Sequence, residues 1–228
     1  CMNTHLAGKS LSDVTYGEMI HFQNILNSFY DTQEELEAAA ELLTEDTDPE
    51  LAVTILKEKL QDMAEDPKMN QALVWYYLAQ FADSPEESRD CLLRCLEEEP
   101  MHFTAMTDLG TRLRRSGDLE GAQGYYEKVL HYEKKEPLAC RGMAILKLLE
   151  GDKEEALTWA RTAYENGPDA LYVRDTYLVT LWENGMTEEA GRIREEMNEA
   201  GTPAEEDTEA LLRGEITLRE YYMEEDAL

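Results

Sequence analysis

Apolar residues in this chain recur every three or four positions, and the stretches in which they do so end at glycine or at short turn sequences. This spacing places the apolar side chains on one face of an α-helix. No stretch alternates between apolar and polar residues as a half-buried strand does, and the helix formers Glu, Leu, Ala and Met dominate. The pattern therefore predicts an all-α protein made of amphipathic helices.

The middle of the chain repeats itself with a period of 34 residues. Three glycines have this spacing: Gly117, Gly151 and Gly185. Three alanines share it: Ala122, Ala156 and Ala190. Aligned on these positions, the sequence forms four consecutive repeats, here numbered 1 to 4: Met69–His102, Phe103–Glu136, Pro137–Ala170 and Leu171–Ala204. Self-similarity at this period is typical of a helical solenoid, in which each repeat stacks on its neighbours.

Each repeat is expected to be a pair of helices separated by a tight turn. The central glycine of repeats 2 to 4 suits the left-handed backbone conformation that ends a helix. Asp118 and Asp152 directly follow two of these glycines, where a short carboxylate can accept hydrogen bonds from the free N–H groups of the second helix. A small residue early in the second helix, such as Ala122 or Ala156, lets the two helices cross closely.

These repeats resemble those of the tetratricopeptide repeat family. The family has alanine at position 20 of each repeat, where this chain has Ser88, Ala122, Ala156 and Ala190. It has a small residue at position 8, where this chain has Tyr76, Gly110, Ala144 and Leu178, so the two central repeats match best. The resemblance implies a right-handed α-solenoid of helix-turn-helix repeats and a non-enzymatic role in binding a protein or peptide.

The resemblance also implies a concave groove lined by the first helix of each repeat. The groove residues expected from the matching positions are Tyr77, Phe81, Thr107, Thr111, Arg114, Arg115, Arg141, Ile145, Leu149, Tyr172, Asp175 and Trp182. This set is less acidic than the whole chain, and aromatic residues and arginine are common interface anchors. The alternative for each residue is packing against a neighbouring repeat or beneath a terminal helix.

The repeats divide the chain into four parts. Residues 1–14 are expected to be a flexible N-terminal segment, and 15–68 to form N-terminal helices that include a degenerate repeat. The four repeats cover 69–204, and 205–228 are expected to be C-terminal helices that cap the last repeat. Capping boxes at Thr15–Glu18 and Thr217–Glu220 indicate helix starts in the flanking parts.

The charge balance narrows the class of partner. The chain has 21 basic and 50 acidic residues and a net charge of −29. Nucleic acid is excluded as the expected partner, because its binding depends on neutralising phosphates with lysine and arginine. The acidic surface either only keeps the chain in solution or attracts a basic partner. The other expected kind of partner is one that binds the groove through apolar anchor residues. No stretch reaches the about 18 apolar residues of a transmembrane segment.

Motifs that carry chemistry are scarce. Cys91 and Cys95 lie one helical turn apart, but Cys95 occupies a core position of its repeat, so packing is favoured over metal binding. Gly8-Lys9-Ser10 is the end of a phosphate-binding loop without the glycine that should begin it. We therefore expect no enzyme activity, no cofactor and no metal site.

The cysteines bear on localisation. The chain begins with Cys1, which fits either a lipid-anchored, exported protein or a piece of a longer chain. However, Cys91, Cys95 and Cys140 lie at core spacing, and exported proteins tend to pair or avoid cysteine. A cytoplasmic protein is therefore favoured, with a membrane-anchored lipoprotein as the alternative.

Three functions remain open at this point. The first is a scaffold that binds a protein or peptide in the repeat groove. The second is a regulatory sensor whose repeats respond to a peptide or other ligand. The third is a repeat array used only for self-association.

Overall fold

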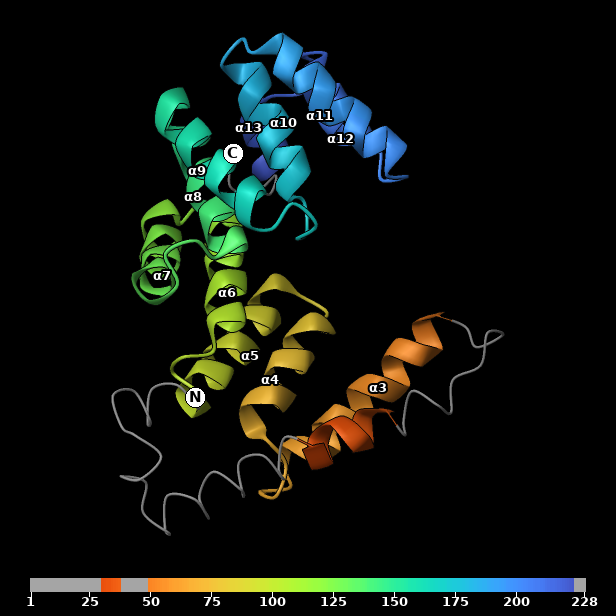
Figure 1. The fold of residues 1–228 in the computed structure, drawn as a ribbon. Helices are drawn as coiled ribbons and strands as arrows, with labels where there is room; N and C mark the ends of the chain where they lie inside the picture. The colour runs from red at the N-terminus through yellow and green to blue at the C-terminus, as the bar shows by residue number, and fades with distance from the viewer. Residues whose placement is uncertain (1–29, 38–48, 224–228) are drawn as a thin grey trace, which may run out of the picture. The chain divides into compact units, whose positions relative to one another are not determined.

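The computed structural model describes residues 30–37 and 49–223, and this part of the chain is helical and contains no strand (Figure 1). The chain divides into two compact units, Cys1–Ala105 and Met106–Leu228, which we describe separately. The all-α fold expected from the apolar pattern is confirmed.

In the N-terminal unit, residues 30–37 are helical, and α3 (Pro49–Ala64) begins at a proline, whose missing N–H costs nothing at a helix start. Repeat 1 contains α4 (Gln71–Gln80) and α5 (Pro85–Glu98), which pack against each other. Asn70 caps α4, and the Ser84 hydroxyl caps α5 by accepting from the Glu87 N–H at 3.1 Å.

Repeats 2 to 4 each consist of two helices, as the 34-residue period predicts. Their bounds are α6 (Phe103–Arg115) and α7 (Leu119–Tyr132), α8 (Pro137–Glu150) and α9 (Lys153–Asn166), and α10 (Val173–Glu183) and α11 (Thr187–Glu199). Except for the start of α6, these helices belong to the C-terminal unit. Within that unit, each helix from α8 to α10 contacts the helix before and after it, and α8 also contacts α10.

The turns between paired helices have the expected chemistry. Gly117, Gly151 and Gly185 have φ values of 91°, 86° and 71°, in the left-handed region that residues with a Cβ atom avoid. Asp118 accepts a hydrogen bond from the Gly121 N–H at 2.9 Å, and Asp152 accepts one from the Glu155 N–H at 3.0 Å. The predicted caps of α7 and α9 are therefore confirmed.

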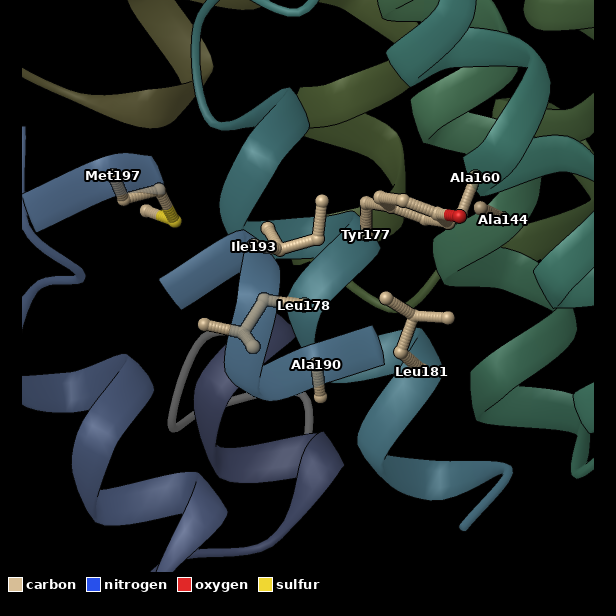
Figure 2. Close-up of a cluster of buried hydrophobic side chains, with 8 residues drawn as sticks. All are labelled: Ala144, Ala160, Tyr177, Leu178, Leu181, Ala190, Ile193 and Met197. Carbon is tan, nitrogen blue, oxygen red and sulfur yellow. The ribbon is translucent and has the colours of Figure 1, made fainter. Parts of the chain in front are cut away.

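The repeats share a core of small residues on one helix and large residues on the next. One buried cluster is formed by Ala144, Ala160, Tyr177, Leu178, Leu181, Ala190, Ile193 and Met197 (Figure 2). Ala144 and Ala190 occupy the small positions 8 and 20 of their repeats and are 0% and 2% exposed. Alanine at these crossings leaves room for the ring of Tyr177 and the side chain of Leu181 from α10.

The C-terminal segment after repeat 4 forms two short helices, α12 (Glu206–Leu212) and α13 (Leu218–Tyr222). α12 does not follow α11 directly, because Gly201 after α11 has a φ of 73° and Glu205 before α12 is extended. The capping box predicted at Thr217 and Glu220 is confirmed, with both of its hydrogen bonds present.

The position of this segment differs from the expectation. It was expected to cover the last repeat, and α12 does contact α10 of that repeat. However, α13 contacts α8 of repeat 3, and Tyr222 reaches Arg114 of repeat 2. The segment turns back at Gly214, whose φ of 73° reverses the chain after α12. The Thr15–Glu18 capping box and Cys1 lie outside the described residues.

Candidate protein-binding surface

The first helices of repeats 2 to 4 bring most of the expected groove residues together. We call the surface presented by α6, α8 and α10 the first-helix surface. Its members from the expected groove are Arg114, Arg115, Arg141, Ile145, Leu149, Tyr172 and Asp175. Position in the first helix, which the repeat pattern specifies, is what places these residues on one surface.

Three arginines of this surface line one cavity, of about 380 Å³. Arg114, Arg115 and Arg141 share it with Tyr172 and with six residues of the C-terminal segment: Glu205, Asp207, Ile216, Glu220, Tyr221 and Tyr222. The repeats thus contribute the positive charge of the cavity, and the segment contributes the carboxylates.

Arg114 is the most buried of the three arginines, with 3% of its surface exposed. Its Nη1 donates a hydrogen bond to the Tyr222 carbonyl oxygen, and its guanidinium lies 5.6 Å from the centre of the Tyr222 ring. No residue in the described part of the chain accepts a hydrogen bond from its Nε. Burial lowers the pKa of Arg114, and the nearby positive charge of Arg141 acts in the same direction. No described carboxylate pairs with this guanidinium, so its main protein contacts are aromatic rings and a backbone carbonyl.

Arg141 holds the start of α10 in place. Its Nε donates to the Tyr172 carbonyl oxygen at 3.3 Å and to the Thr176 hydroxyl at 3.1 Å, and its guanidinium lies 5.5 Å from the Tyr172 ring centre. Tyr172 has a φ of 56°, a left-handed conformation that costs a tyrosine about 1–3 kcal/mol. The contacts with Arg141 offset this strain and orient a partly exposed aromatic ring at the edge of the surface.

The centre of the first-helix surface is apolar and covered. Ile145 of α8 and Val179 of α10 are each 1% exposed and belong to one buried cluster with Leu211 and Tyr222 of the C-terminal segment. Leu149 packs against the same cluster. Burial in this cluster raises the pKa of the Tyr222 hydroxyl.

A polar network joins the segment to α10 beside this cluster. The Thr208 hydroxyl lies 3.2 Å from an Asp175 carboxylate oxygen, to which it donates, and 2.7 Å from the Tyr221 hydroxyl. Thr208 itself is fully buried. Asp175, expected to line an open groove, is therefore a contact of α12.

The remaining expected groove residues of the C-terminal unit lie elsewhere. Thr107 is 4% exposed and so forms part of the core. The Thr111 hydroxyl is 3.2 Å from the hydroxyl of the buried Tyr126. Trp182 is 43% exposed and does not line the arginine cavity.

Tyr77 and Phe81 belong to the N-terminal unit, where they line a separate, mostly apolar cavity of about 240 Å³. Its other lining residues are Gln33, Leu36 and Glu37 of the helical residues 30–37, and Leu56 of α3. These two aromatic side chains therefore face the helices that precede repeat 1.

Sequence reasoning missed the residues that the C-terminal segment contributes: Thr208, Leu211, Ile216, Tyr221 and Tyr222. The available signal was the apolar content of a short acidic stretch, with a capping box directly before two tyrosines. That signal predicts that the stretch folds against something apolar, but it does not say which helix it contacts.

Other chemistry is limited in the described part of the chain. Cys91, Cys95 and Cys140 are buried free thiols, as their core spacing predicts. Burial raises the pKa of Cys95 to about 12 and that of Cys140 to about 11, which disfavours the reactive thiolate. The described residues contain no cluster of three or more side chains suited to a metal ion and no helix with the length and apolarity of a membrane span.

Comparison with solved structures bears on the fold. A tetratricopeptide repeat protein from Parabacteroides merdae ATCC 43184 aligns with 88% of this chain and 86% of its own, with a TM-score of 0.50 and 18% sequence identity. This chain has a tetratricopeptide-repeat fold. The helix pairs of repeats 1 to 4 and their glycine turns agree with that assignment, so the resemblance found in the sequence is confirmed. No protein-family model and no curated protein matches the chain.

Proposed function

We propose that this chain is a non-enzymatic scaffold that binds a protein or peptide on the first-helix surface of its tetratricopeptide-repeat fold. Folds of this type generally serve protein–protein interaction. One observation carries the proposal further: this surface already holds a peptide segment, residues 205–223 of the same chain.

The contacts to that segment are those of a peptide-binding surface. An arginine binds a backbone carbonyl of the segment, an apolar pocket takes its tyrosine, and an aspartate accepts a hydrogen bond from its threonine. A helix laid into an apolar groove with polar contacts at its rim is a common mode of peptide recognition. Arginine and tyrosine, the residues concentrated here, are also those that most often dominate binding energy.

Peptides selected from a random displayed library against the full-length protein test the proposal. Arg141→Ala and Tyr172→Ala should each weaken the selected peptides by about 5- to 30-fold, which corresponds to about 1–2 kcal/mol. Both residues are partly exposed beside the arginine cavity, so truncation removes contacts without emptying a core position. Titration calorimetry measures the affinities, and circular dichroism checks the fold.

Glu154→Ala is the matched control, because Glu154 is an exposed residue in the first turn of α9, outside the first-helix surface. It should leave affinity unchanged. Equal affinity of all three variants and the parent would place peptide binding on another surface and refute the proposal.

A further inference from the structure

The C-terminal segment Glu205–Met223 covers the surface to which we assign binding. Tyr222 is 5% exposed against Ile145 and Val179, and Met223 is 7% exposed. The central apolar pocket and the buried guanidinium of Arg114 are therefore closed to an external ligand while the segment is in place. A scaffold that binds on this surface must either bind around the segment or displace it.

Charge complementarity indicates which kind of peptide the surface prefers. The segment carries six carboxylates and two arginines, and three of the carboxylates, Glu205, Asp207 and Glu220, line the cavity with the three arginines of the repeats. Among the residues that the structure describes, no carboxylate pairs with Arg114 and none accepts a hydrogen bond from its Nε. The surface thus accepts negative charge around a central aromatic pocket.

The segment has little structure that could persist alone. Its helices, α12 and α13, have 7 and 5 residues, and helices shorter than about 12 residues are marginal in water. They are held by Tyr222 in its pocket, by the Thr208 network and by an ion pair between Arg194 of α11 and Glu209. Because neither helix is stable by itself, we expect the segment to open at lower free energy than the stacked helices α8 and α10.

We infer that residues 205–223 are an intramolecular pseudo-ligand, and that the partner is an acidic, short helical peptide with a tyrosine anchor that displaces them. This inference rests on the proposed function and adds to it the chemistry of the ligand and a form of self-inhibition. Because the segment is tethered, its effective concentration at the surface is about millimolar. An external peptide must therefore be present at a higher concentration or bind the surface more tightly than the segment does.

Hydrogen exchange on the unaltered full-length protein tests the displacement directly. The probe is a synthetic peptide of residues 205–223, and a scrambled peptide of the same composition is the control. Amides of α12 and α13 should be at least about 100-fold less protected than those of α8 and α10. Excess probe should lower their protection further and leave α8 and α10 protected, whereas the scrambled peptide should change nothing. Equal protection of all four helices, unaffected by the probe, would show that the segment is a permanent part of the fold and overturn the inference.

A variant with a weakened segment gives the second measurement. A fluorescent form of the probe should bind the full-length Tyr222→Ala variant at least tenfold more tightly than the parent, because the tethered competitor has lost its anchor. Tyr132→Ala, which truncates a tyrosine 57% exposed on α7, is the control and should bind the probe as the parent does. A probe with glutamine at Glu205, Asp207 and Glu220 should bind the Tyr222→Ala variant more weakly and with less dependence on salt. Equal probe affinity for the parent and a folded Tyr222→Ala variant would overturn the inference, and so would equal affinity of the two probes.

The two proposals fail differently. If library peptides bind with dependence on Arg141 but without releasing α12 and α13, the binding function stands and the pseudo-ligand does not. If binding is independent of Arg141, the peptides bind outside the first-helix surface and the proposed function is wrong. A concentration-dependent dimer seen by light scattering, with the segment of one copy seated on another, would overturn the intramolecular assignment.

Discussion

Gly142→Ala probes a close contact between α8 and α7 in the C-terminal unit. Gly142 lies inside α8, and a Cβ atom added there would stand 2.4 Å from Cζ of Tyr126 and 2.6 Å from its Cε1 and Cε2. Tyr126 is fully buried, and a Cβ atom at Gly110 of α6 would stand 2.7 Å from its Cε1. The ring of Tyr126 therefore fills the space that two glycines leave open.

The expected magnitude follows from two opposed effects. Replacing glycine by alanine inside a helix stabilises it by about 1 kcal/mol. Overpacking a buried site costs about 1–3 kcal/mol, and we expect the upper end here because the ring is rigid and the contact is far inside van der Waals distance. The net result should be a loss of about 2 kcal/mol in the free energy of unfolding, measured by urea denaturation followed by circular dichroism.

Gly191→Ala is the matched control. Gly191 lies inside α11, and a Cβ atom added there meets nothing within 4 Å, so this variant should be up to about 1 kcal/mol more stable than the parent. In a Tyr126→Leu background the cost of Gly142→Ala should shrink, with a coupling free energy of about 1–3 kcal/mol. If Gly142→Ala is as stable as Gly191→Ala, or shows no coupling to residue 126, the packing argument is wrong.

Three further predictions concern stability and reactivity. Gly151→Val should lower the free energy of unfolding by about 1–2 kcal/mol through the backbone alone, since φ is 86° and the added Cβ would contact no other part of the fold within 4 Å. Gly151→Asn should lower it clearly less, because asparagine tolerates this conformation better, and urea denaturation measures both variants. Burial raises the pKa of Cys95 to about 12 and of Cys140 to about 11, so both thiols should resist iodoacetamide at about pH 8 until urea unfolds the chain. Because both folded-state pKa values lie above the ordinary thiol value of 9.0, the contribution of these thiols to stability is full below about pH 9 and is lost as the pH rises toward 11 and 12, which should lower the urea midpoint over that range.

Much of the repeat architecture could be predicted because it depends on local chemistry. A glycine that ends a helix, an aspartate that caps the next one and a small residue at a crossing act within a few residues of themselves. Repetition of these signals at a period of 34 residues then locates each helix pair, and Gly117, Asp118 and Ala122 have the predicted roles in the structure. The same local reasoning found the capping box that starts α13.

The residues of the candidate site could be predicted only in part from the sequence. Repeat positions assigned Arg114, Arg141 and Tyr172 to one surface, and all three line one cavity. The sequence left open whether Arg114 lines an open groove or packs beneath a terminal helix, and it did not predict the left-handed backbone of Tyr172, because both depend on what lies opposite these residues. Thr107 shows the reverse case, a residue at a groove position that the tertiary structure places in the core.

By itself, the sequence determined the helices, their pairing and the position of each side chain around its helix, because these follow from periodicity and capping over short distances. Only the tertiary structure decided what covers the first-helix surface. Residues 205–223 are acidic, short in helical runs and joined to the repeats by a turn, and their local pattern fits several apolar partners equally well. The surface that the segment contacts is determined by a pocket that forms only when α6, α8 and α10 pack together. The residues of this pocket are up to 108 positions away from Tyr222, which they bury.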